Sequence, residues 1–204
     1  MFNEKYNKRL AAALKLNGFE TPKELQLKAI TKINGGFDVI GVGPINSGRT
    51  SLIVMSIIQK LQRSFEDAPR ALILVSDMEK ALAMKEKFLL LAKDTDLRIY
   101  SVSEEGKIEK EAAEIYVGTD ILIGTPKRIL DLYFIRNLNL NKIKIFAIDD
   151  AEMMIKIAAQ GHIDRLALSL PKCQHLVFTD GLNEKIEKLI HKFIVAPQII
   201  EVIE

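Results

Sequence analysis

The sequence predicts an α/β fold: a mainly parallel sheet of about seven strands with helices on both faces. Two observations lead to this prediction. Short apolar runs alternate with longer helical patterns along the whole chain, as they do in successive β–α–β units. Most of these runs are continuously apolar, which is typical of strands that are covered on both faces. Because no linker or repeat interrupts the pattern, residues 1–204 are expected to form one domain.

Seven segments carry the strand pattern, each of them a short apolar run with high β propensity. They are Asp38–Val42, Arg70–Ser76, Leu97–Val102, Asp120–Thr125, Ile143–Asp149, His175–Thr179 and Gln198–Ile203. Helical patterns lie between them, among them Thr50–Gln62, Asp77–Ala92 and Asp149–Gln160. Two more helices are expected before the first strand, at roughly Glu4–Leu16 and Pro22–Ile33. Thr21 is the candidate cap of the second of these, with Pro22 at its first helical position.

Composition narrows the classes of function. The 204 residues carry a net charge of +2, which is too small to predict a nucleic-acid or membrane partner from charge alone. Cys173 is the single cysteine, so no intramolecular disulfide is possible and a cytoplasmic location is expected. The chain shows neither a secretory signal nor an apolar run that could span a bilayer, so no membrane partner is expected. The three histidines are scattered, and no structural metal site is expected.

Residues 43–52, GPINSGRTSL, have the spacing of a phosphate-binding loop between a strand and a helix. Gly43 and Gly48 would let the backbone N–H groups turn toward a phosphate, and Thr50 could offer its hydroxyl to Mg²⁺. Two residues depart from the pattern. Arg49 brings a wide guanidinium where the pattern has lysine, and Asn46 stands where many such loops have another glycine. A glycine-containing turn without a ligand remains an alternative.

A second segment, IKIFAIDDAEMM, has the form of a strand that ends in acidic residues. Asp149 at the strand end could hold Mg²⁺, directly or through water, and Asp150 follows where an ATPase places the carboxylate that orients water. The alternative is a helix with acidic residues in its first turn, which the helix dipole favours. The chain order and distance relative to the glycine loop favour a nucleotide site.

Taken together, these residues resemble the N-terminal RecA-like domain of DEAD-box RNA helicases, and the resemblance runs from about Phe2 to the end. The stretch Gly18–Ile30 is similar to the family's Q motif, which in the family stacks an aromatic side chain on adenine and reads its edge with glutamine. The resemblance assigns the nucleotide to Phe19, Gln26, Gly43, Ser47, Gly48, Arg49, Thr50 and Asp149. Within that set it assigns Mg²⁺ to Thr50 and Asp149, if a nucleotide binds.

The RNA-binding motifs are matched in part. Val75–Ala81, VSDMEKA, lies where motif Ia reads P-T-R-E-L-A, and the arginine that contacts RNA in the family is Met78 here. Gly124–Leu130, GTPKRIL, is similar to motif Ib, T-P-G-R. The second match implies contacts to an RNA phosphate by Thr125, Lys127 and Arg128, at a helix start that favours anions. Such binding would be weak, sensitive to salt and indifferent to sequence.

The catalytic motifs differ more strongly from the family's pattern than the RNA-binding motifs do. The segment Asp149–Glu152, DDAE, replaces D-E-A-D, so the family's catalytic glutamate becomes the shorter Asp150. Thr179–Gly181, TDG, replaces S-A-T, so Glu152 would face one hydroxyl fewer and one added negative charge. Asp150 and Glu152 are therefore expected to be degenerate catalytic residues. The second helicase domain, with its arginine finger, is expected to be absent.

The sequence leaves three functions open. The first is a catalytically inactive helicase-like domain that binds RNA or a protein partner and has weak or no affinity for Mg·ATP. The second is a slow ATPase of the DEAD-box type that still binds Mg·ATP. The third is a protein-interaction scaffold that has lost both ligands. Whether the chain is an enzyme therefore stays undecided at this level.

Overall fold

A computed structural model describes residues 2–19, 21–102, 104–135 and 138–203. Its centre is a seven-stranded sheet in the order β3-β4-β2-β5-β6-β1-β7, with every neighbouring pair parallel. The strands are β1 Val39–Val42, β2 Ala71–Leu74, β3 Ile99–Ser101, β4 Ile121–Gly124, β5 Ile145–Ile148, β6 Gln174–Thr179 and β7 Gln198–Glu201. The predicted α/β class and the parallel sheet are confirmed. Most strands are a few residues shorter than their apolar runs.

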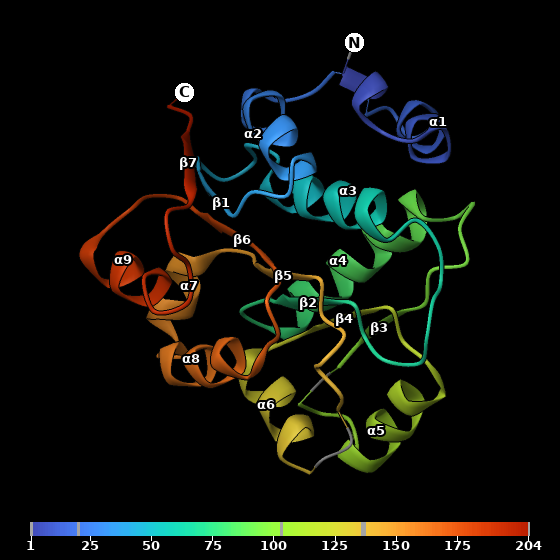
Figure 1. Cartoon of the computed structure of the whole chain (residues 1–204), viewed down its shortest axis with the longest axis vertical. Helices are drawn as coiled ribbons and strands as arrows, with labels where there is room; N and C mark the ends of the chain where they lie inside the picture. The colour runs from blue at the N-terminus through green and yellow to red at the C-terminus, as the bar shows by residue number, and fades with distance from the viewer. Residues whose placement is uncertain (1, 20, 103, 136–137, 204) are drawn as a thin grey trace.

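Helices cover both faces of the sheet (Figure 1). One face packs against the helices α1 Lys8–Leu16, α2 Glu24–Asn34, α3 Arg49–Leu61 and α4 Met78–Leu91. The short 3₁₀ helix η1 Phe2–Lys5 contacts α1 and α2. The other face packs against α5 Ile108–Val117, α6 Pro126–Phe134, α7 Ala151–Lys156, α8 Gln160–Ser169 and α9 Glu184–Ile190. Within the described residues, no helix is long and apolar enough to cross a membrane.

The two hydrophobic layers explain why the strands read as continuous apolar runs. In β2, Ala71 and Ile73 join the layer under α3 and α4, whereas Leu72 and Leu74 join the layer under α5 and α6. All four side chains are fully buried. Successive strand residues point to opposite faces, so a strand with a hydrophobic layer on each face has no polar position.

Two of the predicted helices are each divided into two shorter helices in the structure. The expected helix Glu4–Leu16 is divided into η1 and α1, because the side chain of Asn7 accepts a hydrogen bond from the Leu10 amide at 3.0 Å and starts a new helix. Asp149–Gln160 is likewise divided into α7 and α8, with Ala158 between them in the left-handed region at φ 54°.

The predicted start of α2 was wrong. Thr21 is not its cap, and Pro22 is not its first residue: α2 begins at Glu24, and Lys23 is the N-cap. The reason lies in Gln26, whose side-chain oxygen accepts a hydrogen bond from the Lys23 amide at 3.0 Å. A glutamine at this position satisfies a backbone amide of the helix start and so fixes where the helix begins.

Candidate nucleotide site at the carboxyl edge of the sheet

The glycine loop connects β1 to α3 at the carboxyl edge of the sheet, where α/β proteins bind ligands. Gly43 lies against Val202, and a Cβ added there would come within 2.7 Å of the valine side chain and 3.0 Å of Ser47 Oγ. Gly48 has φ 91°, and a Cβ there would meet Gln26 Nε2 at 2.5 Å. Both positions therefore require glycine, one for close packing and one also for its backbone angle.

A tight turn forms the tip of this loop. The Ser47 amide donates to the Pro44 carbonyl at 3.1 Å, and Asn46 takes the left-handed angle φ 73° at the third position of the turn. Turns of this kind need glycine or asparagine there. Asn46 thus keeps the curled shape of a phosphate loop, at some cost in backbone strain relative to glycine.

Gln26 joins α2 to the loop. Its Nε2 donates to the Gly48 carbonyl at 3.2 Å, and its Oε1 accepts from the Lys23 amide. The side chain is buried. Both ends of the amide are therefore hydrogen-bonded within the protein, and reading an adenine edge would require Gln26 to exchange at least one of these bonds.

The two groups proposed to hold Mg²⁺, the Asp149 carboxylate and the Thr50 hydroxyl, are in contact. Thr50 Oγ1 donates to Asp149 Oδ2 at 2.7 Å, which places the start of α3 beside the end of β5. Asp149 is only 3% exposed, and its Oδ1 is buried without a partner among the described residues. Burial, together with the nearby negative charge of Asp150, raises the pKa of Asp149 to about 6. An orphaned carboxylate oxygen beside a threonine hydroxyl is a suitable pair of ligands for a hard cation.

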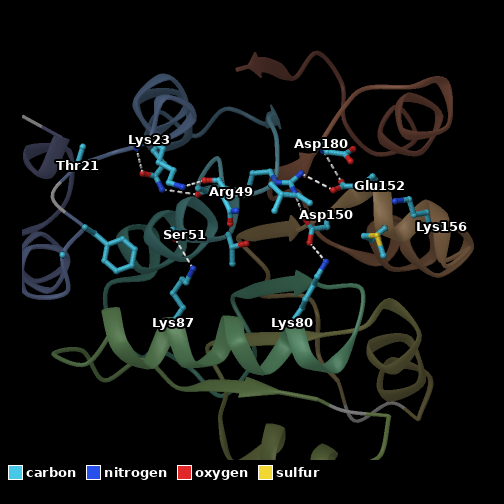
Figure 2. Close-up of a pocket in the computed structure, with 18 residues that line it drawn as sticks. Thr21, Lys23, Arg49, Ser51, Lys80, Lys87, Asp150, Glu152, Lys156 and Asp180 are labelled. Carbon is cyan, nitrogen blue, oxygen red and sulfur yellow. Dashed lines mark hydrogen bonds and ion pairs between the residues drawn. The ribbon is translucent and has the colours of Figure 1, made fainter. Parts of the chain in front are cut away.

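Arg49 is the main departure from a phosphate loop. It is 6% exposed, and its Nη2 lies 2.8 Å from Asp150 Oδ1 while its Nη1 lies 3.2 Å from Glu152 Oε1. The guanidinium therefore bridges two carboxylates at the start of α7 instead of pointing freely at a ligand (Figure 2). Planar guanidinium groups suit such double contacts, which a lysine could not make with the same geometry.

Lys80 adds a second cation to this cluster. Its Nζ lies 2.5 Å from Asp150 Oδ2, so that Arg49 and Lys80 hold the two oxygens of one carboxylate. Asp150 itself has left-handed backbone angles, φ 54° and ψ 59°. The residue at the position of the family's catalytic glutamate is thus neutralised from two sides.

The TDG segment begins at the last residue of β6, beside the same cluster. The Asp180 amide donates to Glu152 Oε2 at 3.2 Å, so Glu152 joins the glycine loop to this segment. Thr179 is fully buried, and its hydroxyl donates to the Gly181 carbonyl at 2.9 Å rather than to Glu152.

These elements surround a cavity of about 660 Å³ (Figure 2). Its lining includes Phe19, which also packs against the hydrophobic layer below. The lining contains both cationic and anionic side chains. They are Lys23, Arg49, Lys80, Lys87, Lys156, Asp150, Glu152 and Asp180.

The residues predicted to bind RNA lie apart from this cavity, at the start of α6. Thr125 caps the helix by accepting from the Arg128 amide at 3.3 Å, and its hydroxyl donates to Glu104 at 2.9 Å. Arg128 is 8% exposed and forms an ion pair with Glu111 at 2.8 Å. Lys127 remains largely exposed and pairs with Asp131 one turn away.

Sequence reasoning missed the lysines of the cavity wall. Lys80 and Lys87 are seven residues apart on α4 and both line the cavity. One signal was available: Lys80 occupies the place of leucine in the P-T-R-E-L-A pattern, where a charge is unexpected. Lys87 and Lys23 carry no such signal, because their placement depends on how α2 and α4 pack around the loop.

Cys173 and His175 come within 3.8 Å of each other, between Sγ and Nε2, at the opposite edge of the sheet. In the part of the chain that the structure describes, no group of three or more His, Cys, Asp and Glu side chains is arranged to hold a metal ion. Burial raises the pKa of the Cys173 thiol to about 11.

An all-parallel sheet with a glycine loop at one strand end and an acidic pair at another defines the class of P-loop nucleotide-binding folds. The family model for the DEAD/DEAH box helicases matches residues 23–189. The chain therefore belongs to the DEAD/DEAH box helicase family, as its resemblance predicted.

Individual relatives agree with this assignment. The chain is 27% identical over 188 residues to the pre-mRNA-processing ATP-dependent RNA helicase PRP5 of Meyerozyma guilliermondii, covering 88% of this chain and 22% of that protein. It is 28% identical to the ATP-dependent RNA helicase eIF4A of Eremothecium gossypii, covering 82% of this chain and 42% of that protein. The chain thus spans less than half the length of these two relatives.

Solved structures show the same fold. A DEAD box protein from Methanococcus jannaschii superposes with a TM-score of 0.89 at 23% identity, over 96% of this chain and 54% of that one. The yeast DEAD-box splicing factor Prp28 superposes with a TM-score of 0.90 at 21% identity, over 97% of this chain and 50% of that one.

Proposed function

We propose that this chain is a DEAD-box helicase-type domain that acts as an RNA- or protein-binding regulatory module, with weak or no ATP binding and little hydrolysis. One observation carries the proposal: the side chain that should meet the phosphates, Arg49, is buried in ion pairs with Asp150 and Glu152. The positive charge that would bind the phosphates of a nucleotide is already paired with carboxylates inside the protein.

A triphosphate would have to compete for this arginine. If Arg49 turned toward a phosphate, Asp150 and Glu152 would lose a partner while remaining mostly buried. Breaking a buried ion pair by removing one partner typically costs 3–5 kcal/mol. Here Lys80 and the Asp180 amide would offset part of this cost. The balance favours weak nucleotide binding.

Hydrolysis meets a further obstacle at Asp150. Each of its two oxygens already accepts from a cation, Arg49 or Lys80, which makes the carboxylate a weaker base toward a water molecule. The aspartate is also one methylene shorter than the glutamate of D-E-A-D. A displacement of about 1 Å of a catalytic group can lower a rate about 100-fold.

Part of the site still fits Mg·ATP. Thr50 and Asp149 would hold the metal, whose chemistry is to neutralise charge on the phosphates. Asp149 keeps an unpartnered oxygen, and the loop keeps its curled shape. These features support the second candidate, a slow ATPase, while a scaffold without either ligand is the third.

RNA binding at α6 would rest mainly on Lys127 and the helix start. The Arg128 guanidinium is held by Glu111, so it has little to offer an RNA phosphate without breaking that pair. The relatives are named RNA helicases, and this is the ground for keeping RNA among the proposed partners. Because few phosphate contacts are expected here, binding should be weak, and salt should lower it only in proportion to that small number of contacts.

The direct test is nucleotide binding by calorimetry, with and without Mg²⁺, beside a phosphate-release assay with and without RNA. We expect ATP turnover at or near background. Turnover that RNA stimulates severalfold, and that Asp149→Ala abolishes, would instead establish the slow ATPase.

Restoring the usual residues of a phosphate-binding loop should change ATP affinity and ATP hydrolysis by different amounts. Arg49→Lys should raise ATP affinity more than hydrolysis, because a lysine cannot bridge Asp150 and Glu152 in the same way and becomes available to phosphate. Asn46→Gly on top of it should raise affinity further, since both residues belong to one loop. If the double variant binds ATP no better than wild type, the loop is only a turn.

A further inference from the structure

The pairing of β3 with β4 brings the segment that follows β3 to the start of α6. The two strands are parallel neighbours, with Ser101 opposite Ile123, so their carboxyl ends lie side by side. The chain then forms a turn and the first turn of α5 after β3, and it enters α6 after β4. Figure 1 shows α5 and α6 on the same face of the sheet. We call residues 104–111 the acidic segment, because it contains four glutamates and only two lysines.

The acidic segment supplies three oxygen acceptors to the start of α6. The Thr125 hydroxyl donates to Glu104 Oε1 at 2.9 Å. The Arg128 guanidinium donates through Nε to Glu111 Oε2 at 2.8 Å, and through Nη2 to the Gly106 carbonyl. Thr125 and Arg128 are two of the three residues expected to contact an RNA phosphate. Oxygen atoms of the protein itself therefore take the hydrogen bonds that a phosphate would need.

The two carboxylates of this contact differ in burial. Glu111 is 6% exposed, and its ion pair with Arg128 joins α5 to α6. Glu104 is exposed, and among the described residues its side chain has a single hydrogen-bond partner, the Thr125 hydroxyl. An exposed side chain with one such contact adds little to the stability of a fold. Packing therefore accounts for Glu111, whereas the place of Glu104 bears mainly on what can bind beside it.

Glu104 opposes a phosphate at this position in two ways. The Thr125 hydroxyl has one hydrogen to donate, and Glu104 accepts it, while the hydroxyl oxygen accepts from the Arg128 amide at 3.3 Å. A phosphate can bond to this hydroxyl only after the carboxylate has moved away. The carboxylate also places a negative charge within hydrogen-bonding distance of Thr125, and like charges repel. Both effects lower the affinity for an anion.

We propose that Glu104 is a specificity-determining residue that excludes an RNA phosphate from the start of α6. The inference rests on the proposed function in one respect, that the start of α6 is where an RNA phosphate would bind. The groups that attract an anion are still present there: the Thr125 hydroxyl, the Lys127 ammonium group and the positive end of the helix dipole. One exposed carboxylate keeps them from a phosphate, so removing it should restore the contact.

The test is fluorescence anisotropy with a short, labelled single-stranded RNA, in the absence of nucleotide and at several salt concentrations. Glu104→Ala should raise RNA affinity at low salt about fivefold or more, because it frees the Thr125 hydroxyl and removes a negative charge. The plot of log affinity against log salt should become steeper by about 0.7, the value for one added phosphate contact to a single strand. Glu104→Gln removes the charge but keeps an acceptor for Thr125, so its affinity should lie between those of wild type and Glu104→Ala.

Two controls locate the effect. Glu109→Gln removes the same charge from an exposed position in the first turn of α5, where the glutamate has no ion pair within the described part of the chain. It should leave the salt slope unchanged and raise affinity much less than Glu104→Ala. The second control is Glu104→Ala in a Lys127→Gln background. The gain in affinity should be smaller there, because both residues act on one phosphate.

Three outcomes would overturn the proposal, with circular dichroism showing that the variants are folded. One is RNA binding by Glu104→Ala that equals that of wild type or of Glu109→Gln. Another is a gain in affinity with the salt slope of wild type, which would mean that no phosphate contact was added. The third is no RNA binding by any variant. Because the assay contains no nucleotide, ATP turnover would count against the proposed function without changing this result, and failure of Glu104→Ala would leave the weak nucleotide binding unaffected.

Discussion

Arg49 and Arg128 occupy similar positions in the fold, but their ion pairs lie in different surroundings. Each lies at the start of a helix that follows a strand, and each is less than a tenth exposed. Arg128 pairs with Glu111 and donates to the Gly106 carbonyl in a closed contact between α5 and α6. Arg49 pairs with Asp150 and Glu152 at the wall of an open cavity.

This difference shows what burial of a charged residue can mean. The partners of Arg128 are all provided by packing, so that its charge is part of the architecture. The partners of Arg49 also face a space that water can enter, so the loss of its ion pairs costs less than the loss of the Arg128 pair. A motif match reports only the residue type, while the surroundings decide whether the charge is available.

The largest effect is expected at Arg128. Arg128→Met should lower the free energy of unfolding by about 3 kcal/mol or more, because the buried Glu111 would lose its ion pair with Arg128. Urea denaturation measures this change. The neighbouring Lys127→Gln should stay within about 0.5 kcal/mol, as expected for a surface residue. If Arg128→Met is as mild as Lys127→Gln, the closed contact does not stabilise the fold.

The next effect concerns pH. The pKa of Asp149 is about 6 in the folded chain and 3.8 for the free side chain, so its contribution to stability is present below pH 3.8 and lost as pH rises to 6. The difference corresponds to about 3 kcal/mol. Asp149→Asn should therefore gain stability relative to wild type between pH 4 and pH 7. Urea denaturation of both proteins across this range measures it, and parallel curves would contradict the assigned pKa.

Arg49→Met should cost less than Arg128→Met, about 1–2 kcal/mol. Asp150 keeps Lys80, Glu152 keeps the Asp180 amide, and both carboxylates can be hydrated through the cavity. The same denaturation series measures the two variants side by side. An equal or greater cost at Arg49 would erase the proposed distinction between the two arginines.

The smallest effect is expected in the loop itself. Asn46→Gly should raise stability by up to about 1 kcal/mol, because φ 73° is strained for asparagine and free for glycine. The added flexibility of the unfolded chain reduces the gain. Thermal unfolding, with the melting temperature as readout, is sensitive enough. A lower melting temperature would mean that the asparagine side chain itself holds the turn.

Sequence alone predicted the sheet well because its strands are buried on both faces. A run such as Ala71–Leu74 has no polar residue, and no packing detail is needed to recognise it. Helix limits were less accurate, since the start of α2 depends on the Gln26 side chain and the break after α7 on a single residue, Ala158, at positive φ. Such local competition is not visible in an apolar pattern.

The sequence predicted that the glycine loop and the acidic segment lie side by side, but not which side chains contact one another. Thr50 and Asp149 were expected near each other and form a hydrogen bond. The contact of Arg49 with Asp150 and Glu152 joins residues about a hundred positions apart, so no local pattern encodes it. The contact of Lys80 with Asp150 was not predicted for the same reason, because Lys80 lies on α4, far from Asp150 in the sequence. Long-range pairing of charges follows from the assembled fold.

The order of the strands has a consequence for synthesis on the ribosome. Strand β1 ends at Val42, yet its two neighbours are β6, which starts at Gln174, and β7, which starts at Gln198. At translation rates of 5–20 residues per second, roughly 7–25 seconds separate β1 from its first neighbour. Throughout that interval both edges of an apolar strand stay open, and the helix α2 that packs on it has no completed surface beneath. A nascent chain of this protein should therefore need chaperone cover until its last two strands have emerged.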